Sequence, residues 1–241
     1  MKLNCDLGES FGAWSMPVEQ DIMKYIDQAN IACGFHAGDP LVMKASLTLA
    51  VSHCVSVGAH PSYPDLQGFG RRSMVVPADE LIAMIQYQIS ALQGMAQLCG
   101  TCVTYVKPHG ALYNDMMKSS EIRKAVMAYV AELGKGDLAL MVQATNHNDA
   151  LRREASTFDL PILFEAFSDR RYTDEGLLTP RGITDAVLNQ QQALEQAEQM
   201  ISQKTVTTLS GKVLPIDADS LCVHGDTADA VDIARKIRAM L

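Results

Sequence analysis

The sequence predicts an α/β protein whose fold is a (β/α)7-type barrel, formed by a single domain over residues 1–241. Three observations lead to this prediction. Seven short apolar runs typical of buried strands alternate along the chain with segments that carry helical signals. The connections between them are short, which favours a parallel sheet covered by helices. A length of 241 residues also suits one barrel domain, and no linker or shift in composition divides the chain.

The seven expected strands are short and apolar, and a turn or a helical segment follows each of them. They lie at Leu3–Asp6, Ala29–Cys33, Val55–Ala59, Val103–Lys107, Leu138–Val142, Ile162–Ala166 and Ser220–Val223.

The intervening helices are recognised by their first turns. Met16–Asp21 begins the first, with proline in the first turn and acidic residues after it, and Pro40 begins the second, which runs through Ser52. Pro77 begins the clearest helix, an amphipathic run to about Leu98 with acidic residues near its positive end. The later helices are expected at Ser120–Leu133, His147–Glu154, Thr184–Gln203 and Ala228–Met240.

One segment near the C-terminus departs from this alternation. Thr205–Leu209 and Val213–Ile216 are strand-like runs separated by Ser210-Gly211-Lys212. A small β-hairpin inserted before the last barrel strand is therefore expected.

Composition and charge restrict the class of protein. Hydrophobic residues make up 48% of the chain and charged residues 20%, as in an ordinary globular domain. The 20 basic residues against 28 acidic residues give a net charge of −8, which disfavours nonspecific binding to nucleic acid or to an anionic membrane. No window approaches roughly 18 consecutive apolar residues, and the N-terminal segment lacks the apolar core of a signal peptide. We expect a cytoplasmic protein whose partners are small molecules or other proteins.

The six cysteines lie mostly within or beside apolar runs, where a reduced thiol behaves as a small hydrophobic group, so structural disulfides are not expected. Cys99 and Cys102 match the CxxC pattern of redox proteins. A redox pair usually opens a helix, whose N-terminus lowers the thiol pKa, whereas this pair closes a helix and precedes a strand. A single CxxC pair is also a poor zinc site, so a structural role is favoured.

Ionisable side chains follow most of the predicted strands. In β/α barrels the loops after the C-terminal strand ends form the active site, so residues that follow different strands meet there. Four of the six histidines come directly after a strand, together with carboxylates, a lysine and arginines, and their convergence predicts an active site. The candidate residues are Asp6, Glu9, His36, His60, Arg71, Lys107, His109, Arg170 and His224.

Each of these residues also has an ordinary structural interpretation when taken alone. A histidine at a strand end is often a hydrogen-bonded structural residue. Asp39 before Pro40 and Asp226 before Thr227 could each be a helix cap and no more.

The residue types at the predicted rim suit hydrolysis by an activated water molecule. Aspartate and glutamate serve as general bases or metal ligands, histidine serves as either, and lysine or arginine holds a carboxylate or a phosphate. The sequence contains neither a GxxxxGK[ST] loop nor a GxSxG elbow, so neither a P-loop nucleotide site nor an α/β-hydrolase nucleophile is supported.

Six long segments, in this order and spacing, resemble the LamB/YcsF family. They are LNCDLGESFG, NIACGFHAGDP, GAHPSYPDLQGFGRR, VKPHGALYN, FSDRRYTDEG and CVHGDT. The resemblance extends from Leu3 to the C-terminal helix and is highly specific, because these are long segments and not a short pattern. It implies a β/α barrel of the glycoside hydrolase/deacetylase kind.

The resemblance also implies a component of an ATP-dependent 5-oxoprolinase. Such an enzyme hydrolyses the lactam of 5-oxoproline (pyroglutamate) to L-glutamate while ATP is hydrolysed to ADP and phosphate, and this chain would act with subunits B and C. ATP is then a co-substrate accompanied by Mg²⁺. Because the chain lacks a P-loop, the partner subunits are expected to perform much of the ATP step, and direct ATP binding by this chain remains open.

For that reaction our hypothesis assigns a role to eight of the candidate residues. Asp6 or Glu9 is expected to be the base for the attacking water, and the histidines are expected to position that water or to donate protons. The histidines in question are His36, His60 and His109, and the groups expected to hold the substrate carboxylate or a transferred phosphate are Lys107, Arg71 and Arg170.

A metal centre and two other functions are kept as alternatives. Fold relatives include deacetylases with an Asp-His-His metal site, which Asp6, His36 and His60 could imitate, although the HxxxH spacing is absent. The alternative functions are a stand-alone metal-dependent deacetylase or carbohydrate hydrolase, and a noncatalytic scaffold subunit.

Overall fold

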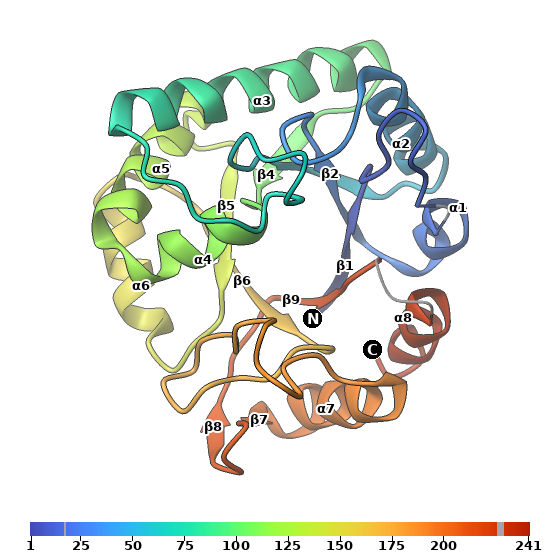
Figure 1. Ribbon diagram of the computed structural model, residues 1–241, viewed down its shortest axis with the longest axis vertical. Coiled ribbons are helices and arrows are strands. Elements are labelled where there is room, and N and C mark those ends of the chain that lie inside the picture. The colour runs from blue at the N-terminus through green and yellow to red at the C-terminus, as the bar shows by residue number, and fades with distance from the viewer. Residues whose placement is uncertain (17, 226–228) are drawn as a thin grey trace.

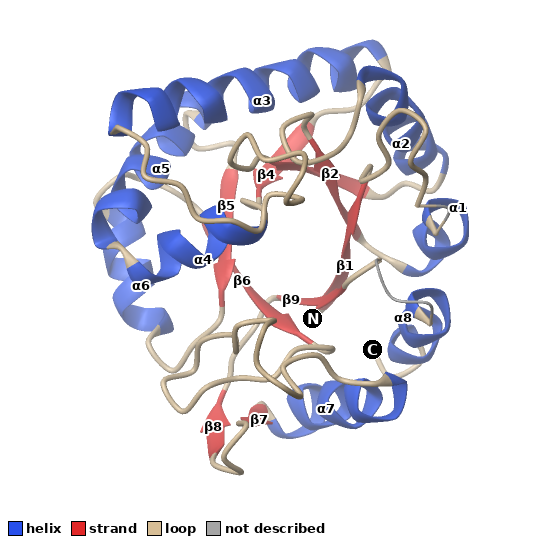
Figure 2. Cartoon of the chain, in the orientation of Figure 1, coloured by secondary structure: helices blue, strands red, loops and turns tan. Residues whose placement is uncertain are grey.

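The computed structural model describes residues 1–16, 18–225 and 229–241. At its centre, parallel strands close into a barrel in the order β1-β2-β3-β4-β5-β6-β9, and helices surround it (Figures 1 and 2). The strands are β1 (Lys2–Leu7), β2 (Gln28–Ala32), β3 (Ser56–His60), β4 (Val103–Val106), β5 (Ala139–Gln143), β6 (Ile162–Phe167) and β9 (Ser220–Val223). The predicted barrel is confirmed, and each predicted strand agrees with the structure to within one residue at either end.

Polar side chains form a hydrogen-bonded layer inside the barrel, which we call the interior layer. Asn4 donates to Ser220 Oγ at 2.8 Å, and Ser220 Oγ donates to Gln28 Oε1 at 2.8 Å. Asn30 donates to Asn4 Oδ1 at 2.8 Å and accepts from the Tyr105 hydroxyl at 2.6 Å. These groups are buried, and each satisfies its neighbour, which removes the desolvation cost of unpaired polar atoms. The interior layer consists of Asn4, Gln28, Asn30, Tyr105 and Ser220.

The Tyr105 side chain crosses β3 to reach the interior layer, and it has room to do so because β3 carries a glycine, Gly58, at the crossing point. A Cβ atom on Gly58 would lie 2.2 Å from the Tyr105 ring, so no larger residue fits without displacing the tyrosine.

The helices pack around the outside of the barrel. Asp39 begins α2 as its N-cap and accepts from the amides of Leu41 and Val42 at 2.9 and 3.0 Å, so its predicted capping role is confirmed. The helices are α1 (Glu19–Ile22, followed by a 3₁₀ turn at Met23–Tyr25), α2 (Pro40–Ser52), α3 (Ala78–Leu98), α4 (Gly110–Lys118), α5 (Ser120–Gly134), α6 (Asn148–Ser156), α7 (Gln190–Gln203) and α8 (Ala230–Arg238).

Two helices differ from the prediction. Helix α4 was not predicted, since Gly110–Asn114 was assigned to the loop after β4; it begins directly after His109, and only Ser119 separates it from α5. Helix α7 begins at Gln190, not at Thr184. The residues before it pair with the segment after β6, where the Leu188 amide donates to Asp169 O at 2.9 Å, and Asn189 then caps the helix.

Two predicted helix starts involve residues outside the described part of the chain. The first helix was expected to begin around Pro17, which is not described, and the described helix begins at Glu19. The last was expected from Ala228, which lies outside the described residues together with Asp226 and Thr227; α8 begins at Ala230.

The remaining local predictions concern the hairpin and the CxxC pair. Strands β7 (Thr205–Thr207) and β8 (Val213–Pro215) pair antiparallel, which confirms the inserted hairpin. Cys99 caps the C-terminus of α3, and neither it nor any of the other five cysteines forms a disulfide. Among the described residues, no helix is both long enough and apolar enough to cross a membrane.

Candidate active site

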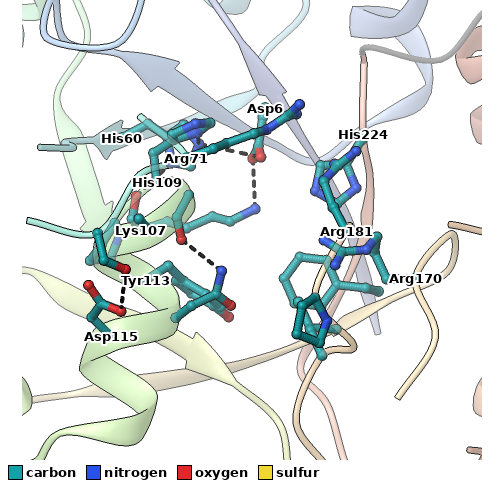
Figure 3. Close-up of a pocket in the computed structure, with 18 of the residues that line it drawn as sticks. Asp6, His60, Arg71, Lys107, His109, Tyr113, Asp115, Arg170, Arg181 and His224 are labelled. Carbon is teal, nitrogen blue, oxygen red and sulfur yellow. Dashed lines mark hydrogen bonds and ion pairs between the residues drawn. The ribbon is translucent and has the colours of Figure 1, made fainter. Parts of the chain in front are cut away.

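The C-terminal ends of the barrel strands surround a pocket of about 280 Å³. Seven of the eight residues predicted for catalysis or binding line it: Asp6, Glu9, His60, Arg71, Lys107, His109 and Arg170. The eighth, His36, is fully buried behind Glu9. Figure 3 shows His60, His109 and Lys107 on one side of the pocket and Arg170, Arg181 and His224 on the other, with Asp6 between them.

Lys107 follows β4 and is buried, and its ammonium group joins two carboxylates. Its Nζ lies 2.7 Å from Asp6 Oδ1 and 2.8 Å from Glu165 Oε1, and it donates to Cys222 Sγ at 3.4 Å. Burial alone would lower the pKa of Lys107, but the nearby Asp6 and the groups around it raise the pKa well above its ordinary value. Lys107 therefore stays charged, and it donates hydrogen bonds to Asp6 and Cys222 while it forms an ion pair with Glu165.

Asp6, at the end of β1, is the carboxylate at the centre of these contacts. Its Oδ1 accepts from Lys107 and from Asn30 Nδ2 at 2.8 Å, and its Oδ2 lies 3.3 Å from His60 Nε2. Burial would raise the pKa of Asp6, but His60 and Lys107 outweigh it and hold the pKa well below its ordinary value. Asp6 is thus ionised at neutral pH.

Three histidines that follow three different strands meet beside Asp6. His60 Nδ1 lies 2.6 Å from Lys107 O, and His109 Nε2 lies 2.9 Å from Phe69 O. The inner nitrogens of these two rings, His60 Nε2 and His109 Nδ1, are 2.9 Å apart. Glu9 Oε1 lies 3.3 Å from His109 Nδ1 and 3.2 Å from His36 Nε2. Burial and neighbouring histidines lower the pKa of both His36 and His109 well below its ordinary value.

We call these buried ionisable groups the rim cluster. Its members are Asp6, Glu9, His36, His60, Lys107, His109 and Glu165.

The donor atoms of Glu9, His36, His60 and His109 lie within 4.8 Å of one another, which invites a test of whether they fit a metal ion. An ion bound to an imidazole lies about 2 Å from the nitrogen, along its lone pair and therefore in the plane of the ring. The His36 and His109 rings are stacked 3.7 Å apart and are parallel to within 5°. One ion cannot lie in both planes, so the four groups do not fit one ion in this arrangement.

The other potential ligand sets are likewise engaged in other contacts. In the set expected from the sequence, Asp6 faces His60, whereas His36 faces Glu9. Asp6, Cys222 and His224 also lie close together, but Lys107 binds the first two and His224 Nδ1 lies 2.9 Å from Asp169. We derive no catalytic step through a metal.

Arginines on both sides of the pocket give it a positive charge, Arg71 beside His60 and Asp6 and Arg170 and Arg181 across from them (Figure 3). Arg170 is nearly buried and donates to Thr179 O at 2.6 Å, and burial together with Arg181 lowers its pKa to about 10. The Arg71 guanidinium lies 4.9 Å from the centroid of the Phe69 ring and lines the pocket beside Asp6. A pocket lined by three arginines, Arg71, Arg170 and Arg181, suits a ligand that carries a carboxylate or a phosphate.

Known proteins resemble this chain over its whole length. The sequence profile of the LamB/YcsF family matches residues 1–241. The chain belongs to the LamB/YcsF family. Two relatives, from Vibrio campbellii and Pseudomonas aeruginosa, are each named as an A-subunit of 5-oxoprolinase and are 49% and 50% identical to it. The alignments cover 100% and 99% of this chain and 95% of each relative.

A solved structure extends the comparison to the fold. The "Lactam Utilization Protein" from Thermus thermophilus is 36% identical and superposes with a TM-score of 0.89, and the alignment covers 99% of this chain and 94% of that one.

The site of this LamB/YcsF protein includes residues that the sequence did not single out. Glu165 lies inside β6, where a charge within an apolar run was the available signal, and Tyr113 donates to its Oε2 at 3.0 Å. Arg181 lies in the irregular segment before α7, and nothing in its local pattern distinguishes it from a surface arginine. Asp226, which was considered as a cap or a functional group, lies outside the described residues.

Proposed function

We propose that this chain is the component of an ATP-dependent 5-oxoprolinase that opens the lactam ring of 5-oxoproline to give L-glutamate. The observation that carries the proposal is the identity of nearly 50%, over the whole chain, to relatives named as A-subunits of 5-oxoprolinase. The name of the Thermus relative, a lactam utilization protein, agrees with the same substrate class. The pocket contributes residues whose chemistry suits that reaction.

The substrate carries one carboxylate, and the arginines that line the pocket would hold it. Arg71 and Arg170 provide charged donors, and Arg181 adds a third. A guanidinium binds a carboxylate through two parallel hydrogen bonds, which orients as well as attracts it. The same donors suit a phosphate transferred to the lactam oxygen.

Two carboxylates that line the pocket would activate water. Asp6 and Glu9 both line the pocket. Because Lys107 and His60 hold the Asp6 pKa well below its ordinary value, Asp6 suits stabilisation of nearby positive charge, and we assign Glu9, which contacts both His36 and His109, as the proton acceptor. Lys107 then acts as a positioning residue that fixes Asp6 and Glu165.

ATP would enter through the partner subunits. A lactam is an unactivated amide, and phosphorylation of its oxygen makes the carbon a better electrophile for water. The chain has no P-loop, so we assign the ATP step, with its Mg²⁺, chiefly to subunits B and C, while this chain supplies the hydrolytic pocket.

The reconstituted complex tests the proposal. The purified chain would be assayed for glutamate and ADP formation from 5-oxoproline and ATP, first alone and then with subunits B and C. We expect glutamate and ADP to form together only in the complete complex. No glutamate from an assembled complex would overturn the proposal.

The same assay separates the two alternative functions. A stand-alone deacetylase would release acetate from acetylated sugars and lose that activity with a chelator, but the clustered donors do not fit one ion. A scaffold subunit would keep full turnover in the complex when Glu9 is replaced by glutamine.

A further inference from the structure

The hydrogen bonds of His60 and His109 determine how many protons the two rings hold. A backbone carbonyl oxygen accepts hydrogen bonds and cannot donate them. His60 Nδ1 lies 2.6 Å from Lys107 O and must therefore carry a proton. His109 Nε2 lies 2.9 Å from Phe69 O and must carry one as well. Each ring thus has the single proton of its neutral form on its outer nitrogen.

The two inner nitrogens then face each other, and in the neutral rings neither of them carries a proton. His60 Nε2 and His109 Nδ1 are 2.9 Å apart, which is a hydrogen-bond distance. Two lone pairs at this distance would repel, so one additional proton must lie between them. Three protons on two imidazoles give the pair one positive charge.

The charges around the pair favour that proton. Asp6 Oδ2 lies 3.3 Å from His60 Nε2, and Glu9 Oε1 lies 3.3 Å from His109 Nδ1, so a carboxylate flanks each inner nitrogen.

Other charged or titratable groups face the pair from the elements packed against it. Lys107 follows β4 and is bound to Asp6 and Glu165. Arg71 follows β3, and His36 follows β2 and stacks on His109. The two positive side chains oppose an additional proton, and the two flanking carboxylates, which are in direct contact with the pair, outweigh them.

We propose that His60 and His109 form a proton-sharing pair with a net charge of +1, and that this pair is the acid that protonates the lactam nitrogen when the ring opens. Both rings line the pocket, so the shared proton lies at the substrate site. The catalytic part of this proposal rests on the proposed function; the proton count does not.

The proton transfers balance over one ring opening. When the bond between the carbonyl carbon and the nitrogen breaks, its electron pair passes to nitrogen, which takes the shared proton from the pair. The attacking water gives a proton to Glu9 as its oxygen bonds to the carbon. Glu9 then returns that proton to His109 Nδ1 through their 3.3 Å contact, which restores the starting state. The carbon keeps the phosphorylated oxygen as an acyl phosphate, the proton of the new hydroxyl group passes to solvent, and a second water hydrolyses the acyl phosphate to the carboxylate and inorganic phosphate.

His36 has a different role from the pair. It does not line the pocket, and its Nε2 contacts Glu9 Oε1 at 3.2 Å while its ring stacks on His109. We assign it as a positioning residue for both.

The proton count can be measured on the full chain labelled with ¹⁵N-histidine. After dialysis against EDTA, long-range ¹H–¹⁵N correlations at pH 7 report the protonation of every ring nitrogen, and single histidine variants assign the signals. We expect protonated His60 Nδ1 and His109 Nε2, with intermediate shifts on the two inner nitrogens. Two neutral rings, or inner-nitrogen signals that appear only after zinc is added, would overturn the proposal.

The catalytic role can be measured in the complete complex with His109→Gln. We expect kcat to fall by about 10²–10⁴-fold with little change in KM. In the wild type, kcat should fall as pH rises through the apparent pKa of the pair, and this limb should move in the variant. His53→Gln, on the exposed end of α2, is the matched control. If kcat of His109→Gln falls over the same pH range as kcat of the wild type, His109 has only a structural role.

The two proposals fail in distinguishable ways. If the wild-type complex makes no glutamate, the proposed function is wrong, while the NMR spectrum still decides the proton count. If the complex turns over and the rings prove neutral, the proton-sharing pair alone is wrong.

Discussion

The interior layer and the rim cluster occupy neighbouring levels of the same barrel, yet one is neutral and the other is charged. Asn4 and Asp6 lie two residues apart on β1, so their side chains are on the same face of the strand. Tyr105 and Lys107 have the same relation at β4, and Asn30 Nδ2 joins the two levels through its bond to Asp6. Along β1 and at β4, the inward-facing side chains therefore change from neutral to charged between one inward position and the next.

The difference shows what each level does. Neutral amides and hydroxyls satisfy one another in the interior layer and impose little cost on the fold. Buried charges are costly even when paired, and replacing them with apolar groups often stabilises a protein. Their concentration at the pocket, and not one layer below it, supports our proposal that the rim cluster serves chemistry while the interior layer serves stability.

The largest expected effect follows from replacing the central carboxylate of the rim cluster. Asp6→Asn removes the negative charge that Lys107 and His60 share, so turnover of 5-oxoproline in the complex should fall by about 10²–10⁴-fold. Asp149→Asn, at a side chain 80% exposed on α6, is the matched control. Near-wild-type turnover by Asp6→Asn would show that the rim charge is not used in the reaction.

Weaker binding of the substrate is expected when an arginine that lines the pocket is replaced. Arg71→Gln removes a charged hydrogen-bond donor, a loss of about 1.5–3 kcal/mol, so KM for 5-oxoproline should rise by roughly 10–100-fold with a smaller change in kcat. Steady-state kinetics against Arg152→Gln, which replaces a surface arginine, provide the comparison. An unchanged KM would assign the substrate carboxylate to other residues.

Stability, not turnover, should respond in the interior layer. Ser220→Ala leaves Asn4 Nδ2 and Gln28 Oε1 without the hydroxyl that each contacts at 2.8 Å, so the free energy of unfolding should fall by about 1–3 kcal/mol. Urea unfolding measures the loss, and turnover per folded chain should be unchanged. A loss of turnover without a loss of stability would show that Ser220 contributes to the reaction at the rim cluster.

The smallest effect is expected outside both levels. Asp39→Ala removes the cap of α2, which accepts from Leu41 and Val42, and should cost about 0.5–2 kcal/mol in unfolding free energy. Asp39→Asn should restore most of it, because asparagine caps equally well. A drop in kcat with unchanged stability would instead give Asp39 a functional role.

The fold could be predicted from the sequence because its signals are local. Each barrel strand is a short apolar run, and Asp39-Pro40 is a strong local signal for the start of a helix. Helix α4 was missed because the functional pattern KPHGALYN concealed a helix that begins at Gly110. Helix α7 was extended too far because the residues before it pair with the segment after β6, where the Leu188 amide donates to Asp169 O and the Arg171 amide donates to Ala186 O.

From the sequence, only the site residues at or just after the strand ends could be predicted. Asp6 and His60 lie at the C-terminal ends of β1 and β3, and Lys107 and His109 follow β4, so barrel topology alone brings them together. Glu165 points into the site from within β6, and its pairing with Lys107 depends on side-chain directions that the sequence does not reveal. The stacking of His36 on His109 likewise appears only in three dimensions.

The most direct test compares Asp6→Asn and Ser220→Ala with the wild type in one experiment on the complex with subunits B and C. Glutamate formation per folded chain and urea unfolding would be measured for all three proteins. We predict that Asp6→Asn loses turnover by at least about 10²-fold, and that Ser220→Ala loses only stability. Equal turnover in all three, or no glutamate from the assembled wild-type complex, would contradict the assignment of lactam opening to the rim.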